Sequence, residues 1–280
     1  MAGRILITGC SSGIGLHAAQ SLAAEGWRVF ATARKADDVE RLAGLGLEAL
    51  RLDLDDSTSI EAAVAEVLRR TDGRLDALFN NAGFGQVGAV EDLSRAALRA
   101  QFETNLFGTV ELTNRILPAM RHQGHGRIVM NSSVLGYAAF AYRGAYVAAK
   151  FGLEGITDTL RQELKGSGIH VSLIEPGPIT SRFRDNCVPH FMRHIDWQHS
   201  VHRDAYAAQL ERLGKPGPAA PFTLGPEAVL DRLRHALTSP RPRARYPVTV
   251  PAVLFWWLRR VLPIAAMDWV LARASGGGRR

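Results

Sequence analysis

A tyrosine and a lysine four positions apart, Tyr146 and Lys150, have the types and spacing that acid–base chemistry needs. Residues four apart share one face of a helix, so a helix running to about Leu164 places the Lys150 ammonium below the Tyr146 phenol. A nearby cation favours the phenolate. Free tyrosine titrates near pH 10, so acid–base work near pH 7 requires a shift of about three units, roughly 4 kcal/mol. Because the same spacing also describes a common surface pair, the surrounding residues must decide.

A serine at the end of a predicted strand is the natural partner of this tyrosine. Ser133 lies thirteen residues before Tyr146. Its hydroxyl can donate a hydrogen bond to a substrate oxygen and hold that oxygen against the phenol. The neighbouring Ser132 points to the opposite side if the strand continues that far.

Two other tyrosines lie near this serine and compete for the same role. Tyr142 is eight residues, or two helical turns, from Lys150, and Tyr137 is farther away. Neither can replace Tyr146 as the acid, and we expect both to line the pocket.

A glycine-rich turn follows the first predicted strand and opens an amphipathic stretch, Leu16–Glu25. The segment Thr8–Gly15 has the spacing Gly-x3-Gly-x-Gly rather than Gly-x-Gly-x-x-Gly. Backbone N–H groups at a helix start can bind a pyrophosphate, and glycine allows close approach because it has no Cβ. A purely structural turn is the alternative.

Short apolar runs alternate with stretches of helical spacing over the first 175 residues, which predicts βαβ units on a parallel sheet. The predicted strands are Arg4–Thr8, Trp27–Ala33, Glu48–Leu52, Leu75–Asn80, Arg127–Asn131 and Ile169–Glu175. The proline-rich stretches Pro216–Pro226 and Pro240–Pro247 are predicted loops around one more helix, Glu227–Leu237, and do not separate a second core. We therefore predict an α/β fold: one doubly wound Rossmann-type domain over residues 1–280, with a mostly parallel sheet of about seven strands flanked by helices.

Polar residues follow two further predicted strands. Asp53-Leu54 follows the third strand, where a carboxylate can accept from an adenine amino group, and Asn80–Gly83 follows the fourth. Ligands of open α/β sheets bind at the carboxyl ends of the strands, near the switch in strand order. Each segment could be an ordinary turn, but together with the glycine-rich turn they predict a nucleotide site.

In this order, these motifs resemble those of the short-chain dehydrogenase/reductase family, in its single-domain branch. The resemblance covers about residues 3–180. The matching segments are Thr8–Gly15, Asp53-Leu54, Asn80–Gly83, Asn105, Ser133, Tyr146, Lys150 and Pro176-Gly177. It implies an oxidoreductase that transfers a hydride between a nicotinamide cofactor and a carbonyl or alcohol.

The resemblance also assigns roles to residues. The catalytic set is Asn105, Ser133, Tyr146 and Lys150, in which Asn105 holds a water that links Lys150 to solvent and Lys150 also binds the nicotinamide ribose, while Thr180 holds the carboxamide. The cofactor set is Gly9, Ser11, Ser12, Gly13, Ile14, Gly15, Arg34, Asp53, Leu54, Asn81, Ala82, Gly83, Tyr146, Lys150, Pro176, Gly177, Ile179 and Thr180. The expected substrate set is Ser133, Leu135, Tyr142, Tyr146 and Phe183.

The end of the second predicted strand bears on the choice of nicotinamide cofactor. An NAD site usually has Asp or Glu there for the ribose 2′-hydroxyl, whereas this chain has Ala33 followed by Arg34. Because a guanidinium can bind a 2′-phosphate bidentately, we expect a preference for NADP(H), with NAD(H) still possible. The alternative is that Arg34 is simply a solvated residue.

Composition excludes several other classes. The net charge of +7 is spread along the chain, and arginine greatly outnumbers lysine, so we expect no nucleic-acid partner. The N-terminus lacks a signal-peptide pattern and the two cysteines form no disulfide framework, which together predict a cytoplasmic protein. No apolar run is long enough to span a membrane. We expect a homo-oligomer.

A group of histidines lies near the second cysteine. His190, His194, His199 and His202 follow Cys187 and could suggest zinc. Their His-x-x-x-His spacing lacks the intervening Glu of a metalloprotease, and the expected chemistry needs no metal, so we predict no metal site.

The resemblance makes residues of about 181–215 a flap over the substrate. Phe183, Phe191, Met192 and Trp197 would make the flap apolar. An apolar pocket predicts a lipophilic carbonyl or alcohol, steroid-, retinoid- or lipid-like, rather than a small sugar.

The segment from about 250 to 273 should form a C-terminal extension of two short amphipathic helices with a break at Pro263. The helices either cover the core or a subunit contact, or roof the substrate pocket. Phe255-Trp256-Trp257, followed by Arg259-Arg260, could instead lie at a membrane interface, which leaves a peripheral membrane-associated lipid reductase as an alternative. A non-catalytic nucleotide-sensing protein is disfavoured, because such a protein tends to lose Ser133, Tyr146 or Lys150.

Overall fold

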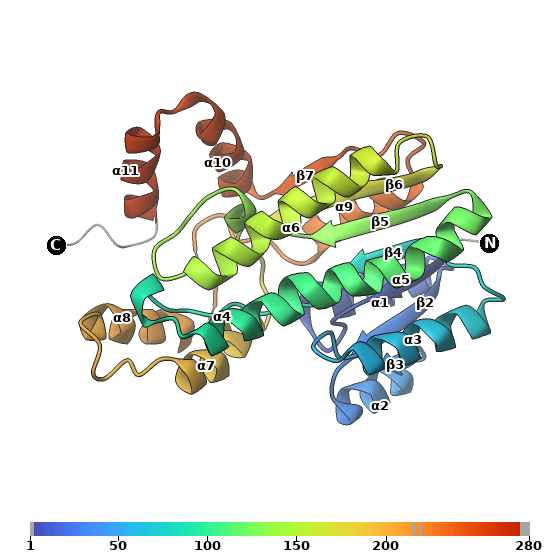
Figure 1. The fold of residues 1–280 in the computed structure, drawn as a ribbon, viewed down its shortest axis with the longest axis horizontal. Coiled ribbons are helices and arrows are strands. Elements are labelled where there is room, and N and C mark those ends of the chain that lie inside the picture. The colour runs from blue at the N-terminus through green and yellow to red at the C-terminus, as the bar shows by residue number, and fades with distance from the viewer. Residues whose placement is uncertain (1–2, 215–216, 219, 275–280) are drawn as a thin grey trace.

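Seven parallel strands form one sheet in the order β3-β2-β1-β4-β5-β6-β7 (Figure 1). The computed structural model describes residues 3–214, 217–218 and 220–274. The strands are β1 (Arg4–Ile7), β2 (Arg28–Ala33), β3 (Glu48–Arg51), β4 (Ala77–Asn80), β5 (Gly126–Asn131), β6 (Ile169–Pro176) and β7 (Arg245–Val248). The strand order reverses between β1 and β4, so the predicted doubly wound fold is confirmed.

Helices cover both faces of this sheet (Figure 1). One face packs against α1 (Gly13–Ala24), α2 (Ala36–Gly44) and α9 (Glu227–Thr238). The other packs against α3 (Ser57–Arg70), α5 (Gly108–Gln123) and α6 (Gly144–Glu163). Within β1, Ile5 and Ile7 belong to the first core cluster and Leu6 to the second. This burial on both faces is why the central strands have nearly continuous apolar runs.

The seventh strand lies where the sequence predicts a loop. Residues of Pro240–Pro247 were expected to be irregular, but Arg245–Val248 pairs with the end of β6, Pro247 opposite Glu175. A proline cannot donate to a ladder, and it is tolerated here because β7 is the edge strand. The proline signal therefore marks an edge and not a break in the sheet.

Shorter helical elements complete the carboxyl side of the fold. They are α4 (Arg95–Phe102), the π-helical turn Glu103–Phe107, the 3₁₀ turns Val90–Asp92 and Val134–Gly136, α7 (Phe183–His194) and α8 (Arg203–Gly214). The two predicted C-terminal helices are present as α10 (Val250–Val261) and α11 (Ile264–Ala274), separated at Leu262-Pro263. Figure 1 shows this pair standing out from the sheet and its covering helices. No helix of the described residues is both long and apolar enough to cross a bilayer.

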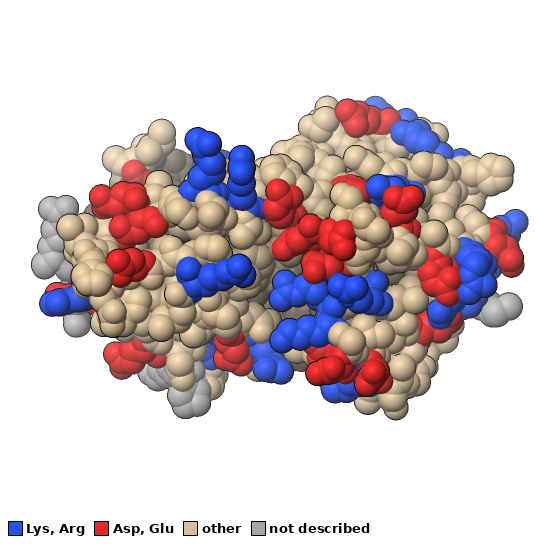
Figure 2. Space-filling model, turned by 60° about the horizontal axis from the view of Figure 1, so that its bottom comes forward, with Lys and Arg blue, Asp and Glu red and all other residues tan. Residues whose placement is uncertain are grey.

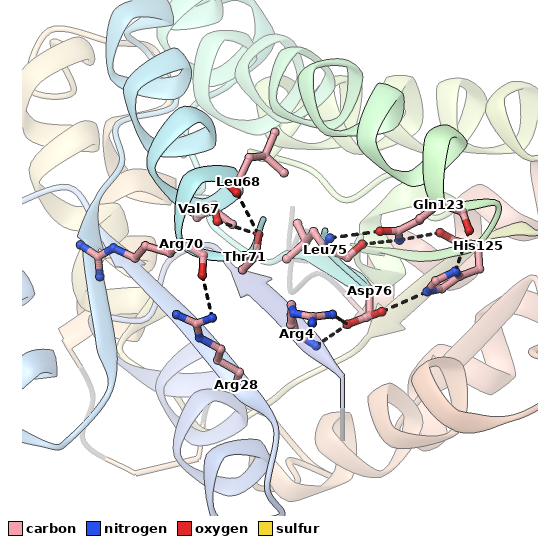
Figure 3. A network of polar contacts seen from close by, with 10 residues as sticks. All are labelled: Arg4, Arg28, Val67, Leu68, Arg70, Thr71, Leu75, Asp76, Gln123 and His125. Carbon is pink, nitrogen blue, oxygen red and sulfur yellow. Dashed lines mark hydrogen bonds and ion pairs between the residues drawn. The ribbon is translucent and has the colours of Figure 1, made fainter. Parts of the chain in front are cut away.

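The amino end of the sheet is closed by a polar network around Asp76 (Figure 3). The Asp76 carboxylate accepts hydrogen bonds from the backbone N–H of Arg4 at 2.7 Å and pairs with its guanidinium at 3.3 Å. His125 contacts the other carboxylate oxygen at 3.0 Å, and the Gln123 amide donates to the Leu75 carbonyl at 2.8 Å. These contacts join the starts of β1, β4 and β5.

The described surface mixes both signs of charge. On the face shown in Figure 2, Lys and Arg side chains are interspersed with Asp and Glu. Many of them form short-range pairs, such as Arg69 with Glu66 at 2.8 Å. Exposed pairs of this kind contribute little to stability.

Candidate active site

The glycine-rich turn between β1 and α1 adopts a backbone that only small residues permit. Gly9 has a φ of +71° and Gly13 a φ of +58°. A Cβ on Gly15 would lie 2.3 Å from the Gly9 carbonyl oxygen and 2.5 Å from the Asn81 amide nitrogen. The turn is thus packed tightly enough that each of these glycines is required.

The turn leaves backbone donors available at the start of α1. The first N–H groups of a helix have no intrahelical acceptor, and the Ser12 side chain does not cap them. The first turn of α1 contains no acidic residue that would oppose an anion. This cradle of glycine and unused N–H groups fits the pyrophosphate of a dinucleotide.

Thr8 and Asn81 bind the neighbouring strand ends together. The Thr8 hydroxyl accepts from the backbone N–H groups of Asn81 and Ala82, each at 2.9 Å. The Asn81 amide donates to the Thr8 carbonyl at 2.9 Å and accepts from the Asn131 amide at 2.9 Å. These hydrogen bonds join the ends of β1, β4 and β5.

Tyr146 and Lys150 lie on one buried face of α6, as predicted. Their exposed fractions are 7% and 4%. The Lys150 ammonium lies 5.7 Å from the centroid of the Tyr146 ring and donates to the Asn131 carbonyl at 2.7 Å. Burial lowers the pKa of Lys150 to about 8, and the nearby Glu154 acts against this shift.

The predicted lowering of the Tyr146 pKa depends on Lys150 together with a positively charged nicotinamide ring. Among this chain's own groups, burial is the largest influence and raises the pKa of the phenol, while Ser133 acts to lower it. The Lys150 ammonium donates to the Asn131 carbonyl. A lowered value therefore requires a further positive charge next to the phenol.

Ser133 faces Tyr146 from the turn after β5. Its hydroxyl accepts from the Leu135 backbone N–H at 3.1 Å and lies next to the phenol, where it acts to lower the pKa of Tyr146. Ser132 is buried on the other side of this segment, next to Glu154, in agreement with the predicted alternation. The structure thus brings the Ser133 and Tyr146 hydroxyls together and leaves Leu135 beside them.

Asn105 lies in the π-helical turn between α4 and α5 and is 1% exposed. Its amide oxygen accepts from the Phe84 backbone N–H at 3.2 Å, and its amide nitrogen donates to the Phe84 carbonyl at 2.9 Å. A Cβ on Gly83 would come within 3.3 Å of the same side chain. Asn105 is therefore fixed against the segment that follows β4.

The ends of β2 and β3 carry the residues expected to select the cofactor. Ala33 is buried at the end of β2, and Arg34 follows it with an exposed side chain. Asp53 is half-buried and accepts from the backbone N–H of Asp55 at 3.2 Å, while Leu54 is buried. These side chains lie at the same carboxyl edge as the glycine-rich turn.

The segment after β6 continues the same edge. The Gly177 backbone N–H donates to the Val248 carbonyl at 2.9 Å, next to Pro176 at the strand end. Ile179 pairs with Leu224, and the Thr180 backbone N–H donates to the Leu224 carbonyl at 2.9 Å. The Thr180 side chain is exposed.

The predicted flap, residues 181–215, contacts Tyr146 through α7. The last residue of this expected range, Lys215, lies outside the described residues. The Phe183 ring meets the Tyr146 ring edge-on, with centroids 5.6 Å apart. Phe191, expected to make the flap apolar, is fully buried, with its ring centroid 5.3 Å from that of Tyr206. Cys187 is also buried in this cluster.

The two competing tyrosines lie away from Lys150. Tyr142 packs its ring against Tyr206, with centroids 5.9 Å apart, beneath α8. The Tyr137 hydroxyl donates to the Ala252 carbonyl at 2.8 Å, beneath α10. Tyr137 therefore supports the C-terminal helices, although the sequence places it in the pocket.

Three of the four histidines near Cys187 have separate partners. His190 stacks on Phe84 with centroids 3.6 Å apart, His199 pairs with Asp196, and His202 pairs with Glu91. Across the described ranges, no three His, Cys, Asp or Glu side chains gather in a group that could hold a metal ion.

Three residues were not in the predicted catalytic, cofactor or substrate sets, although Thr8 belongs to the glycine-rich motif and His190 was considered as a zinc ligand. Asn131 links Lys150 to Asn81, Thr8 joins β1 to β4, and His190 fixes α7 onto the segment after β4. Asn131 directly precedes the serine pair and Thr8 precedes the first glycine, so position next to a motif was the available signal. His190 offered none, because its partner lies far away in sequence.

The sequence model described as short chain dehydrogenase matches residues 4–190. The chain is 48% identical over 267 residues to the uncharacterized oxidoreductase YbbO of Escherichia coli (strain K12), covering 95% of this chain and 93% of that protein. It is 35% identical over 260 residues to human 17-beta-hydroxysteroid dehydrogenase type 1, covering 88% and 77%. This chain belongs to the short-chain dehydrogenase/reductase family and is an oxidoreductase.

Solved structures share the fold. A short-chain dehydrogenase/reductase of Burkholderia phymatum in complex with NAD is 25% identical, with a TM-score of 0.78 and coverage of 93% and 92%. Actinorhodin polyketide ketoreductase with NADPH is 30% identical, with a TM-score of 0.71 and coverage of 88% and 95%. Nicotinamide cofactors of both kinds therefore occur among the structural neighbours.

Proposed function

We propose that this chain is an NADP(H)-dependent oxidoreductase that transfers a hydride between nicotinamide and the carbonyl or alcohol carbon of a lipophilic, steroid-, retinoid- or lipid-like substrate. The observation that carries the proposal is the buried Tyr146 phenol, which has Ser133 beside it and the Lys150 ammonium 5.7 Å from its ring centroid, one helical turn away. This arrangement stands beside a cradle suited to a dinucleotide.

Each residue then has one task. In the direction of reduction, Ser133 donates a hydrogen bond to the carbonyl oxygen, and Tyr146 donates the proton that the oxygen acquires. Lys150 stabilises the resulting phenolate, and Asn105 connects Lys150 to solvent so that the phenol can be reprotonated. A bound nicotinamide dinucleotide supplies the hydride, and its oxidised ring supplies the positive charge that the phenolate also needs.

The decisive experiment replaces Tyr146 by Phe. The Tyr146→Phe variant should lose turnover, with kcat reduced at least about 1,000-fold, while its Kd for NADPH changes less than about threefold. Tyr246→Phe is the matched control, because Tyr246 lies on β7 with its hydroxyl hydrogen-bonded to His235 at 2.8 Å. A Tyr146→Phe variant with near-normal kcat would show that Tyr146 is not the proton donor, and the proposed mechanism would be wrong.

The preference for NADP(H) is supported by the end of β2. The last residue of β2 is Ala33, where an NAD site usually has a carboxylate, and the next residue is Arg34. The exposed Arg34 guanidinium can bind a 2′-phosphate. Arg34→Ala should raise KM for NADPH at least about tenfold and leave KM for NADH within about twofold. Arg69→Ala, at an exposed position of α3, should change neither; equal effects of Arg34→Ala on both cofactors would make Arg34 an ordinary surface residue.

The lipophilic substrate is supported by the apolar neighbours of Tyr146. Phe183 meets its ring from α7, and the turn after Ser133 is covered by the C-terminal helices. The similarity to a named hydroxysteroid dehydrogenase points in the same direction. Purified enzyme with NADPH should reduce steroid, retinoid and long-chain carbonyls with kcat/KM well above that for sugars; the reverse order would overturn this assignment.

A peripheral lipid enzyme is a second candidate, favoured by the outer face of the C-terminal helices. This face exposes large apolar side chains: Val250, Val253, Leu254, Trp257, Val261, Ile264 and Trp269. The Arg260 and Arg273 guanidinium groups lie 3.5 Å from the ring centroids of Trp256 and Trp269. Arginine and tryptophan beside an apolar stripe suit an anionic lipid surface. Of the predicted Phe255-Trp256-Trp257 anchor, only Trp257 is largely exposed.

Sedimentation with vesicles tests this second candidate. The full chain should pellet with phosphatidylcholine–phosphatidylglycerol vesicles, and Trp257→Ala with Trp269→Ala should weaken binding at least about fivefold. If the chain stays in the supernatant and the double variant changes a dimer into monomers in light scattering, the face is instead a contact between two copies, and the lipid proposal is wrong.

A further inference from the structure

A row of ionisable side chains continues from the active tyrosine along α6. Tyr146, Lys150, Glu154 and Asp158 are spaced by four residues and so share one face of the helix. Glu154 is the carboxylate within one turn of Lys150 on this helix, and its side chain is only 6% exposed. A buried carboxylate needs a compensating partner, and the structure supplies one from a distant strand.

That partner is Arg245 of β7, which joins three carboxylates. One terminal nitrogen of its guanidinium donates to Glu154 and, at 2.5 Å, to Glu175. The other terminal nitrogen donates to Asp158 at 2.6 Å. Glu175 is fully buried and directly precedes Pro176, which begins the segment expected to bind the cofactor.

The turn that carries Ser133 closes over the same carboxylate. A Cβ on Gly136 would lie 2.7 Å from a Glu154 oxygen and 2.6 Å from the Ser132 hydroxyl oxygen. The Ser132 hydroxyl is buried next to Glu154 at the same point of the turn. Glu154 therefore touches the turn of Ser133 on one side and lies one helical turn from Lys150 on the other.

Burial and one shared guanidinium act on both buried carboxyl groups of this cluster. Burial and the neighbouring Glu154 raise the pKa of Glu175 to about 8. Burial also raises the pKa of Glu154, and Arg245, which donates to its carboxylate, opposes that rise. Of these two groups, Glu154 is the one that lies next to Lys150, where it favours the protonated ammonium.

We propose that Glu154, held by Arg245, is a positioning residue that keeps Lys150 protonated and fixes the turn of Ser133 against α6. The inference rests on the acid–base role proposed above for Tyr146 and Lys150. It assigns a function to a residue pair 91 positions apart that lies outside the motifs of the site.

Charged and polar groups face Lys150 and Glu154 from α6, β5, the turn after β5, β6 and β7. Lys150 faces Tyr146 and Glu154 of its own helix and the Asn131 carbonyl of β5. The groups around Glu154 are Asp158 of α6, Ser132 and Tyr137 of the turn after β5, Glu175 of β6 and Arg245 of β7. Asp158 is further paired with Arg161 at 2.5 Å.

The chain's lysine content makes a direct test practical. Lys35, Lys150, Lys165 and Lys215 are its only lysines, so protein labelled with ¹³C at lysine Cε gives four signals in NMR. A Lys150→Met variant assigns the Lys150 signal. In Glu154→Gln the midpoint of that signal should fall about one pH unit below its wild-type value, because the amide carries no charge.

Asp158→Asn is the matched control, since Asp158 also binds Arg245 but lies two turns from Lys150. It should leave the Lys150 midpoint within about 0.3 units of wild type. The alkaline limb of the pH profile of kcat should move down by the same amount in Glu154→Gln and stay in place in Asp158→Asn. A merely structural role would lower stability in both variants and move neither titration.

Two outcomes separate this inference from the proposed function. If Glu154→Gln leaves the Lys150 titration and the kcat profile unchanged, the positioning role is wrong, while the Tyr146→Phe result still decides the mechanism. Arg245→Lys guards against loss of folding, because a lysine keeps the positive charge. It should preserve most of the Lys150 midpoint, and a fall as large as that in Glu154→Gln would overturn the proposal that the carboxylate itself supplies the effect.

Discussion

At the amino end of the sheet the Asp76 carboxylate is surrounded by donors, whereas at the carboxyl end the Tyr146 phenol and the Lys150 ammonium are buried with few partners. Burial alone would raise the pKa of Asp76, but the hydrogen bonds from Arg4 and His125 outweigh it and hold that pKa below its usual range. Burial dominates for the two active-site groups, raising the pKa of Tyr146 and lowering that of Lys150.

The two ends therefore use polar groups for different purposes. A fully hydrogen-bonded carboxylate stabilises one arrangement of strands and has no reason to change its charge. A buried group with few partners has a protonation state that a small addition of charge can change, which is what acid–base chemistry requires. The following predictions test this division, beginning with the largest effect.

Gly15→Ala should disrupt the glycine-rich turn at the carboxyl end of the sheet and weaken cofactor binding. The added Cβ would collide with the Gly9 carbonyl and the Asn81 amide, so the turn must open. We expect the Kd for NADPH to rise at least about 100-fold, measured by quenching of protein fluorescence. Gly155→Ala, where a Cβ would meet nothing within 4 Å, is the control and should leave binding unchanged. Normal NADPH binding by Gly15→Ala would show that the turn tolerates displacement.

Asp76→Ala should remove the polar network at the amino end of the sheet and lower stability without changing catalytic turnover. Losing the bonds to Arg4 and His125 should lower the free energy of unfolding by about 2–3 kcal/mol, as measured in urea. The kcat of the folded protein should stay within about twofold of wild type, because the network lies at the opposite end of the strands from Tyr146. A tenfold fall in kcat with unchanged stability would show that the amino end of the sheet contributes to catalysis and not to stability, contrary to this comparison.

The contribution of Asp76 to stability should also depend on pH. Because its folded pKa is lowered, the stabilisation is complete above the unfolded value of about 3.9 and is lost as the pH falls through the folded value. The difference in urea midpoint between wild type and Asp76→Asn should be constant from about pH 5 to 7 and shrink below about pH 4. A difference that grew on acidification would show the opposite sign of linkage.

The smallest effect concerns the thiols near the site. Burial raises the pKa of Cys10 to about 12 and that of Cys187 to about 11, so very little thiolate exists at pH 8. In native protein, Ellman's reagent should react with neither thiol within minutes, and in urea it should react with both. Rapid reaction of one thiol, assigned with Cys10→Ser, would show that the site opens far more often than its packing suggests.

Local sequence signals were sufficient for most of the fold and for the core of the site. The strands from Arg4 to Glu175 were predictable because burial on both faces leaves apolar runs, and Tyr146 and Lys150 because helical spacing places them on one face. The edge strand at Arg245–Val248 was missed because its prolines resemble a loop.

Other features depend on partners that are distant in sequence. Phe191 was predicted to make the flap apolar, but its packing against Tyr206 of the following helix could not be predicted from local spacing. The Lys150 ammonium donates to a carbonyl of β5, a contact that helical spacing alone does not indicate. The ion cluster of Arg245 joins residues 70 to 91 positions apart, which no local spacing can indicate.

The strand order has a consequence for how the chain is made. The interior strand β1 is the first one synthesised, but its neighbour β4 begins only at Ala77, and the hydrogen bond between Arg4 and Asp76 spans 72 positions. Until that segment leaves the ribosome, one edge of Ile5–Ile7 has no native partner. Translation arrested before residue 77 therefore leaves a fully apolar strand with an open edge, and this is the stage at which the nascent chain is most exposed to aggregation or to binding by chaperones.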